Sequence, residues 1–158
     1  MNDFSHIDNT GNPVMVDVGA KKISHRTATA ESIVLLPKEV LNKLMNGDIQ
    51  TKKGAVFQTA IIAGIMAAKK TGELIPLCHP LGLENCAIDI IVNKENEVVI
   101  TCTATIESKT GVEMEALVGA TIAALTVYDM CKALSHDIII KETKLIKKTG
   151  GKKDFERK

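Results

Sequence analysis

The sequence predicts an α+β fold, in which helices cover one face of a single antiparallel β-sheet. Three observations carry this prediction: a hairpin of two alternating strands, two long apolar segments of helical length, and strand-like runs before and after them. The 158 residues suit one domain. Within it we expect residues 1–14 to form a flexible N-terminal segment and residues 148–158 a mobile basic loop and tail.

The first half of the chain predicts a strand followed by two helices. Thr27–Leu36 alternates small or apolar residues with polar ones, as a strand does, and Pro37 ends it. Lys38–Asn46 has the pattern of a short amphipathic helix that Gly47 closes. Lys53–Lys70 predicts a longer helix, which is apolar nearly all round and is therefore buried on more than one side.

The second half predicts a hairpin, a long helix and a last strand. Cys86–Val92 and Glu97–Glu107 alternate apolar and polar residues on either side of a short turn, which is typical of a hairpin. Gly111–Leu134 then has the length and composition of a core helix. Ile138–Lys147 completes the pattern as a strand that breaks near Glu142.

This order, β-α-β-β-α-β with an extra short helix, predicts a ferredoxin-like fold whose long helices pack on one face of the antiparallel sheet. The other face carries Val99 and Ile91 among threonines and acids, so we expect a contact between subunits there. The hairpin Cys86–Glu107 contains no aromatic residue, which disfavours an RNA-binding sheet that stacks bases.

Composition narrows the class of protein further. A net charge of +1 gives no argument for a nucleic-acid partner or an anionic membrane. The longest apolar stretch, Ala55–Ala68, falls short of the roughly 20 residues that span a bilayer. Met1–Met15 lacks the apolar segment of an export signal, so we expect a cytoplasmic protein. The four cysteines form no C-x-x-C pair, which favours free thiols over a zinc site.

The near-neutral total hides an uneven distribution of charge. Residues 51–70 carry four lysines and no acid, residues 71–137 have a balance of −7, and residues 138–158 have a balance of +5. In the last segment, Lys147–Lys153 places two glycines between lysines. Such a loop is either a solvated tail or a mobile segment that binds an anion through ammonium and backbone N–H groups.

Leu77–Leu81 contains the first candidate for chemistry, His79. A histidine titrates near neutral pH, so it can transfer a proton or bind a phosphate when charged. The alternative is a histidine whose ring hydrogen-bonds a backbone carbonyl. A metal site built on Cys78 and His79 is disfavoured, because adjacent residues rarely both reach one ion and no partner pair lies nearby.

Thr110–Glu115 contains two carboxylates at the start of the long helix. Thr110 and Glu113 match a T-x-x-E capping box, in which Glu113 binds a backbone N–H and does no chemistry. Glu115 lies two residues further on, nearly on the opposite side of a helix, so at most one of the two glutamates is expected to face a given pocket of one chain.

Asp129 and Lys132 lie three residues apart near the other end of that helix, so they can form an ion pair. Exposed, the pair is an ordinary surface contact; desolvated, the lysine becomes a proton donor or base. The apolar neighbours of the pair favour some burial. Glu113 and Asp129 are about 24 Å apart along the helix, so a pocket that uses both needs two subunits.

These segments together resemble the cyclic pyranopterin monophosphate synthase family of molybdenum-cofactor biosynthesis. The Cys-His-Pro and Gly-Val-Glu-Met-Glu blocks are specific in combination. The matching stretches are residues 15–18, 25–26, 53–54, 62–71, 74–81, 109–117, 123–133 and 150–152.

The resemblance implies a phosphorus–oxygen lyase with no resident cofactor or metal. Its substrate is 3′,8-cyclo-7,8-dihydroguanosine 5′-triphosphate, and it releases cyclic pyranopterin monophosphate and pyrophosphate. Any Mg²⁺ would accompany the triphosphate. The resemblance also implies a ferredoxin-like fold and a homohexamer, a trimer of dimers, with active sites at the dimer interface.

Site residues carry over by position. The resemblance implies catalytic roles for Asp129, Lys132, Lys53 and His79, with Lys52 as an alternative to its neighbour. Lys53, His79 and Lys148 would supply positive charge to the triphosphate, while Lys132 and Asp129 would transfer protons. The implied substrate-binding residues are Cys78, His79, Glu113, Met114, Glu115, Lys148 and Arg26.

Two other hypotheses remain. An oligomeric ferredoxin-like sensor that binds a nucleotide without turnover shares the fold and the basic loop. A scaffold whose charged groups are only surface pairs requires no ligand. Pyrophosphate release from the cyclic substrate separates the three hypotheses.

Overall fold

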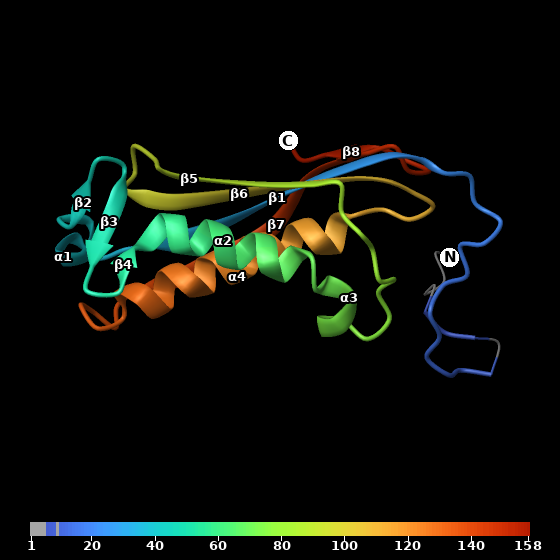
Figure 1. Cartoon of the computed structure of the whole chain (residues 1–158), viewed down its shortest axis with the longest axis horizontal. Coiled ribbons are helices and arrows are strands. Elements are labelled where there is room, and N and C mark those ends of the chain that lie inside the picture. Colours follow the sequence, from blue (N-terminus) through green and yellow to red (C-terminus); the bar gives the residue numbers. More distant parts are fainter. Residues whose placement is uncertain (1–5, 9) are drawn as a thin grey trace.

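The computed structural model describes residues 6–8 and 10–158, and its fold is α+β with an antiparallel sheet (Figure 1). The five strands lie in the order β5-β6-β1-β7-β8, and each neighbouring pair is antiparallel. The strands are β1 (Ser24–Leu35), β5 (Asn85–Val92), β6 (Glu97–Ser108), β7 (Ile139–Thr149) and β8 (Phe155–Glu156).

Two long helices, α2 (Val56–Ala68) and α4 (Glu113–Cys131), pack side by side on one face of this sheet (Figure 1). The predicted period-2 pattern is confirmed, because alternate residues of the two central strands are buried beneath the helices. These are Ala28, Ala30, Ser32 and Val34 of β1, and Val98, Ile100, Cys102, Ala104 and Ile106 of β6.

Glycines allow the two helices to approach closely. A Cβ added to Gly64 of α2 would lie 2.7 Å from the carbonyl oxygen of Gly119, and one added to Gly119 would lie 2.6 Å from Sγ of Cys102. There is therefore no room for a methyl group at Gly64, between α2 and α4, or at Gly119, between α4 and β6.

The predicted helix Lys38–Asn46 is wrong beyond its first turn. Only α1 (Lys38–Leu41) is helical, and a small three-stranded sheet follows: β2 (Leu44–Met45), β3 (Asp48–Thr51) and β4 (Gly54–Ala55). Asn46 and Gly47 both have positive φ, 52° and 80°. An Asn-Gly pair of this conformation makes a two-residue hairpin turn, so Gly47 closes a hairpin rather than a helix.

The helix predicted over Lys53–Lys70 starts at Val56, so Lys53 lies on the turn between β3 and β4. The loop predicted after it contains a short helix, α3 (Thr71–Leu74). The long helix predicted over Gly111–Leu134 is confirmed as α4, with shorter ends.

The break expected near Glu142 is a shift of register and not an interruption, because β7 is continuous over Ile139–Thr149. The pairing of β7 with β1 shifts register between Glu142 and Ile140 and again between Lys147 and Leu145. The sequence did not predict β8, which pairs with Lys147 and Lys148. Mobility of residues 148–158 stays a prediction, as does that of residues 1–14, of which 1–5 and 9 lie outside the described residues.

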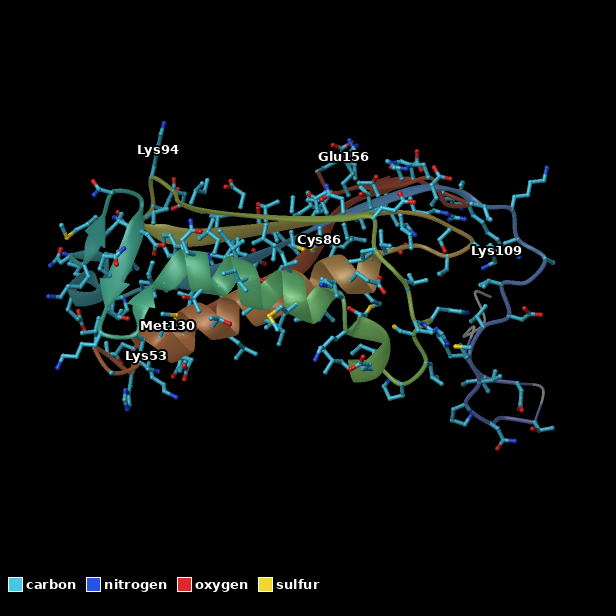
Figure 2. The ribbon with its side chains drawn as sticks, viewed as in Figure 1. Lys53, Cys86, Lys94, Lys109, Met130 and Glu156 are labelled. Carbon is cyan, nitrogen blue, oxygen red and sulfur yellow. The ribbon has the colours of Figure 1, made fainter. Side chains whose placement is uncertain are left out.

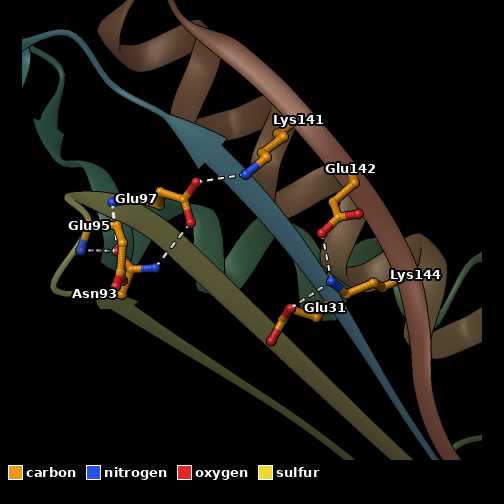
Figure 3. A network of polar contacts seen from close by, with 7 residues as sticks. All are labelled: Glu31, Asn93, Glu95, Glu97, Lys141, Glu142 and Lys144. Atoms are coloured by element: carbon orange, nitrogen blue, oxygen red, sulfur yellow. Dashed lines mark hydrogen bonds and ion pairs between the residues drawn. The ribbon is translucent and has the colours of Figure 1, made fainter. Parts of the chain in front are cut away.

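The face of the sheet opposite the helices is open in this single chain. Ion pairs join β7 to β6 and β1, from Lys141 to Glu97 at 2.9 Å and from Lys144 to Glu31 at 3.6 Å (Figure 3). Within β7, Lys144 also pairs with Glu142 at 2.6 Å. Among them Ile91 is 52% exposed. This mixed polar and apolar surface agrees with the sequence pattern, whereas its use as a subunit contact stays a prediction.

Helix α4 is long and apolar enough, by length and composition alone, to cross a membrane. Half of that stretch is buried inside the fold, where it packs on β1, β6 and α2. A core helix has the same properties, so this observation does not contradict the expected absence of a membrane-spanning segment.

Candidate functional site

The predicted site residues fall into two groups at opposite ends of α4. We call Lys53, Asp129 and Lys132 the C-terminal cluster, because they gather where α4 ends. Figure 2 shows Lys53 at the same end of the molecule as Met130, and Lys109 at the far end. The second group surrounds a cavity at the start of α4, which we call the N-terminal cavity.

In the C-terminal cluster, two lysines share one carboxylate. Lys132 Nζ lies 2.7 Å from Asp129 Oδ1, and Lys53 Nζ lies 3.2 Å from Asp129 Oδ2. Lys53 also donates to the backbone carbonyl of Asp129 at 3.4 Å. Positive charge at this position is favourable, because the C-terminal end of a helix carries partial negative charge.

The cluster is exposed in the single chain, contrary to the expected burial. The side chains of Asp129, Lys132 and Lys53 are all more than half exposed. Hydrogen bonds from Lys132 and Lys53 lower the pKa of Asp129, and the hydrogen bond to Asp129 raises the pKa of Lys132. Both groups are therefore charged at neutral pH, and Lys132 is a proton donor rather than a base until something covers it.

Beside the cluster lies a cavity of about 780 Å³. Its lining combines three lysines with neutral polar and apolar side chains: Lys43, Gln50, Thr51, Lys52, Lys53, Met130, Ala133 and Leu134. The sequence left Lys52 and Lys53 as alternatives. Both line the cavity, and of the two it is Lys53 that contacts Asp129.

The N-terminal cavity has a volume of about 560 Å³. It gathers all but one of the predicted substrate-binding residues, from a loop, the start of α4 and the end of β7: Cys78, His79, Glu113, Met114, Glu115 and Lys148. Lys148 lies within β7, opposite Ala28, and not on the loop where the sequence placed it. Strand β7 therefore holds the Lys148 side chain next to the first turn of α4.

The capping box predicted for Thr110 and Glu113 is wrong. Val112 is the residue before α4, and no side chain caps the helix there. Glu113 instead accepts a hydrogen bond from Lys148 Nζ at 2.8 Å. The carboxylate is thus free of the backbone and is tied to a cation that also lines the cavity.

Glu113 and Glu115 both line the cavity, which corrects the expectation that one chain presents only one of them. Both occupy the first turn of α4, together with Met114, which also lines the cavity. Glu115 is only 3% exposed. Burial raises its pKa to about 7, and the negative charge of Glu113 adds to the shift.

The backbone contact expected for His79 is confirmed, whereas its role in proton transfer or phosphate binding stays a prediction. Its Nε2 lies 2.9 Å from the carbonyl oxygen of Val16, as expected for a ring that hydrogen-bonds the backbone. The same ring also lines the cavity. Val16 and Lys21 line it too, so the N-terminal segment forms one wall of the cavity. The sequence marked residues 15–18 only as a stretch that matches the family and did not predict this wall.

Arg26 lies beside the N-terminal cavity rather than in it. It donates to the carbonyl oxygens of Ser108 and Lys109 at 3.3 and 3.4 Å, and it lines a small space with Glu113 and Lys148. Next to it, Gly150 has a φ of 83°, and a Cβ there would collide with the carbonyl of His25. The paired glycines therefore let the chain pass close to β1.

No group of three His, Cys, Asp or Glu side chains suited to a metal ion occurs among residues 6–8 and 10–158. Cys78, Cys86, Cys102 and Cys131 are free thiols. The side chains available for chemistry in the two regions are carboxylates, ammonium groups, the imidazoles of His6 and His79 and the thiol of Cys78.

Comparison with known proteins gives similar chains over almost the full length. A cyclic pyranopterin monophosphate synthase from Xanthomonas oryzae is 51% identical, over 96% of this chain and 92% of that protein. A molybdenum cofactor biosynthesis bifunctional protein from Synechocystis is 52% identical, over 98% of this chain and 46% of its own length. Molybdenum cofactor biosynthesis protein 1 from Dictyostelium discoideum is 51% identical, over 96% of this chain and 27% of its own length.

The chain thus spans less than half the length of two of these relatives and nearly all of the third. The model of the MoaC family matches residues 15–151, which include both ends of α4 and every predicted site residue. The chain belongs to the MoaC family.

Proposed function

We propose that this chain is a cyclic pyranopterin monophosphate synthase of molybdenum-cofactor biosynthesis. It converts 3′,8-cyclo-7,8-dihydroguanosine 5′-triphosphate into cyclic pyranopterin monophosphate and releases pyrophosphate. The observation that carries the proposal is the match of residues 15–151 to the family, together with a 51% identical synthase that the chain covers almost completely.

The residue chemistry supports a phosphorus–oxygen lyase. Closing the cyclic phosphate requires a sugar hydroxyl to attack the α-phosphorus while the bond to pyrophosphate breaks. The negative charge of the departing pyrophosphate must be neutralised, and the lysines that line the cavities at both ends of α4 can supply the positive charge. Rearranging the purine ring needs repeated proton transfers, for which Asp129, Lys132 and Glu115 supply titrating groups.

The two ends of α4 support an active site shared between chains. Glu113 and Asp129 belong to one continuous helix and lie about 24 Å apart along it. One small triphosphate cannot reach both from a single chain. We propose that the C-terminal cluster of one subunit faces the N-terminal cavity of another, in a dimer that assembles into a hexamer.

This arrangement also explains the exposure of Asp129 and Lys132. A second subunit would remove water from the pair, and the lower dielectric would make their electrostatic effect on a substrate stronger. The fold assignment we propose is ferredoxin-like, because the order β5-β6-β1-β7 has its neighbours antiparallel and both long helices on one face. The cytoplasmic location expected from the sequence is part of the same proposal.

The decisive test is incubation of the purified chain with the cyclic triphosphate, followed by measurement of pyrophosphate and of the cyclic monophosphate. We expect both products in equal amounts. Tight binding without pyrophosphate would favour the nucleotide sensor instead, and absence of binding would favour the scaffold. Omitting Mg²⁺ in a parallel reaction tests whether the metal is needed to neutralise the triphosphate.

A further inference from the structure

Asp48 makes more backbone contacts than an ordinary surface aspartate. Its Oδ1 accepts hydrogen bonds from the N–H groups of Ile49 at 2.6 Å and Phe57 at 2.7 Å. Its Oδ2 accepts one from the N–H of Gln58 at 3.1 Å. The carboxylate is half-buried, and it joins the start of β3 to the first turn of α2.

These contacts replace a missing helix cap. The residue before α2 is Ala55, which has no side chain able to cap, and the first turn of α2 contains no acid. The N–H groups of the second and third helical residues, Phe57 and Gln58, are the ones that an N-cap side chain normally satisfies. Asp48 satisfies both from another strand, seven residues before the normal cap position.

A cap placed on another strand has a consequence that a local cap lacks. Between Asp48 and α2 the chain makes the β3–β4 hairpin, and Lys53 lies on its turn. Thr51 closes that turn, because its hydroxyl contacts the carbonyl of Gly54 and the N–H of Lys53, both at 3.1 Å. Asp48 therefore holds the base of the hairpin, and Thr51 holds its tip.

The same carboxylate lies close to the end of α4. Cys131, two residues after Asp129, is buried, and burial together with the negative charge of Asp48 raises its pKa to about 11. The hairpin base, the start of α2 and the last turn of α4 thus meet around Asp48. Lys53 reaches Asp129 from this junction.

We propose that Asp48 is a positioning residue for catalysis: by tying β3 to the start of α2, it holds the hairpin so that Lys53 meets Asp129. This inference rests on the proposed function only for its kinetic part. Its structural part, the distance between Lys53 and Asp129, can be measured without substrate.

The test separates positioning from simple helix capping. Asp48→Ala removes both the cap and the link to β3. Ala55→Asp, added to Asp48→Ala, gives α2 a local N-cap but leaves β3 unlinked. Ala55→Asp alone controls for the new carboxylate near Lys53, and Lys53→Ala gives the reference for complete loss of the contact.

Three measurements are made on each variant: thermal unfolding for the Tm, steady-state kinetics with the cyclic triphosphate for kcat and KM, and the titration of the Asp129 carboxyl by ¹³C NMR. We expect the double variant to regain the wild-type Tm but to keep a kcat about 10- to 100-fold below wild type, with KM unchanged. Its Asp129 should titrate at a higher pH than in wild type, as in Lys53→Ala. Ala55→Asp alone should behave as wild type in all three measurements.

Recovery of both Tm and kcat in the double variant would overturn the proposal, since Asp48 would then only cap α2. If the double variant stays unstable, comparison of Asp48→Asn with Asp48→Ala below their Tm decides, because the Asn amide oxygen still accepts from Phe57 and keeps the link to α2. Asp48→Asn should titrate Asp129 near the wild-type pH and Asp48→Ala nearer to that of Lys53→Ala, and equal titrations in the two variants would contradict the proposal. Lack of turnover by the wild type would refute the proposed function but leave the titration readout intact.

Discussion

The two ends of α4 differ in burial and in the state of their charges. At the C-terminal cluster, Asp129 is exposed, and the two lysines beside it lower its pKa. At the N-terminal cavity, Glu115 is 3% exposed, and burial raises its pKa to about 7. One end therefore presents fixed charges to solvent, while the other encloses a group that titrates near neutral pH.

This difference indicates that each end is half of a site. The C-terminal cluster carries charged side chains that are open to solvent. The N-terminal cavity encloses a titrating carboxyl, but it lies at the other end of α4 from Asp129 and Lys132. Catalysis by positioned charges is most effective where water is excluded. A second subunit that places one end against the other would supply what each lacks.

The largest expected effect comes from the cluster itself. Asp129→Ala or Lys132→Ala should lower kcat by about 10²–10⁴-fold, the range for loss of a general acid or base, without changing the fold or the oligomer. Turnover, circular dichroism and sedimentation measure these three properties. Glu95→Ala and Lys94→Ala, on the exposed turn between β5 and β6, control for loss of a surface charge. Normal turnover by both cluster variants would refute the site assignment.

The two neighbouring lysines offer a matched pair. Lys53→Ala should lower kcat by about 10²-fold, since it removes the ammonium group that contacts Asp129. Lys52→Ala should leave kcat nearly unchanged, because Lys52 lines the same cavity but makes no ion pair with Asp129. Steady-state kinetics of the two variants under the same conditions check this. Equal losses would mean that charge density, and not the contact, matters at this end.

Glu115 makes stability depend on pH. Its pKa is raised by folding from 4.5 to about 7, so the folded state binds the proton more tightly than the unfolded state. Its contribution to the free energy of unfolding is therefore complete below about pH 4.5 and is lost as the pH rises through 7, by up to about 3 kcal/mol. Urea unfolding between pH 5 and 8, at fixed protein concentration, measures this slope.

Glu115→Gln should flatten that slope, because the amide does not titrate. Glu95→Gln, which removes an exposed carboxylate, serves as the matched control. An equal slope in wild type and Glu115→Gln would mean that this carboxyl is solvated in solution, and the contrast between the two ends would then disappear.

The smallest expected effect tests the connection between the ends. Gly64→Ala should lower the free energy of unfolding by about 1–3 kcal/mol, because its Cβ would lie 2.7 Å from the carbonyl oxygen of Gly119. Gly82→Ala is the control, since nothing lies within 4 Å of a Cβ there. Chemical denaturation measures both variants. Equal stability would show that α2 and α4 have freedom to shift along one another.

The sequence predicted the main sheet well because its signals are periodic. The alternation in β6 and the apolar length of α4 depend only on which residues are buried, and both were confirmed. The small sheet was missed because Asn46-Gly47 fits two structures: a glycine can end a helix or close a hairpin. Only the positive φ of both residues distinguishes them.

The sequence predicted which residues belong to the site better than it predicted which of them contact one another. The resemblance named the residues that the structure gathers at the two ends of α4, yet Glu113 was assigned to a capping box. Its real partner, Lys148, is 35 residues away in the chain, and no local pattern predicts such a contact. The link between Asp48 and the start of α2 was missed for a similar reason, since a cap is sought next to the helix that it caps.

The shared site can be tested by mixing two inactive subunits. Asp129→Ala inactivates the C-terminal cluster and His79→Ala the N-terminal cavity. When the two variants are co-expressed in equal amounts, random pairing makes half of the dimers mixed. In each mixed dimer, one site combines the intact cavity of the Asp129→Ala subunit with the intact cluster of the His79→Ala subunit, and the other site carries both substitutions.

We expect the mixture to regain about a quarter of wild-type turnover, although each variant alone is inactive. Turnover no higher than that of the single variants, in oligomers shown by mass spectrometry to contain both chains, would contradict this expectation. The two ends of α4 would then serve separate purposes, or a single chain would hold the complete site.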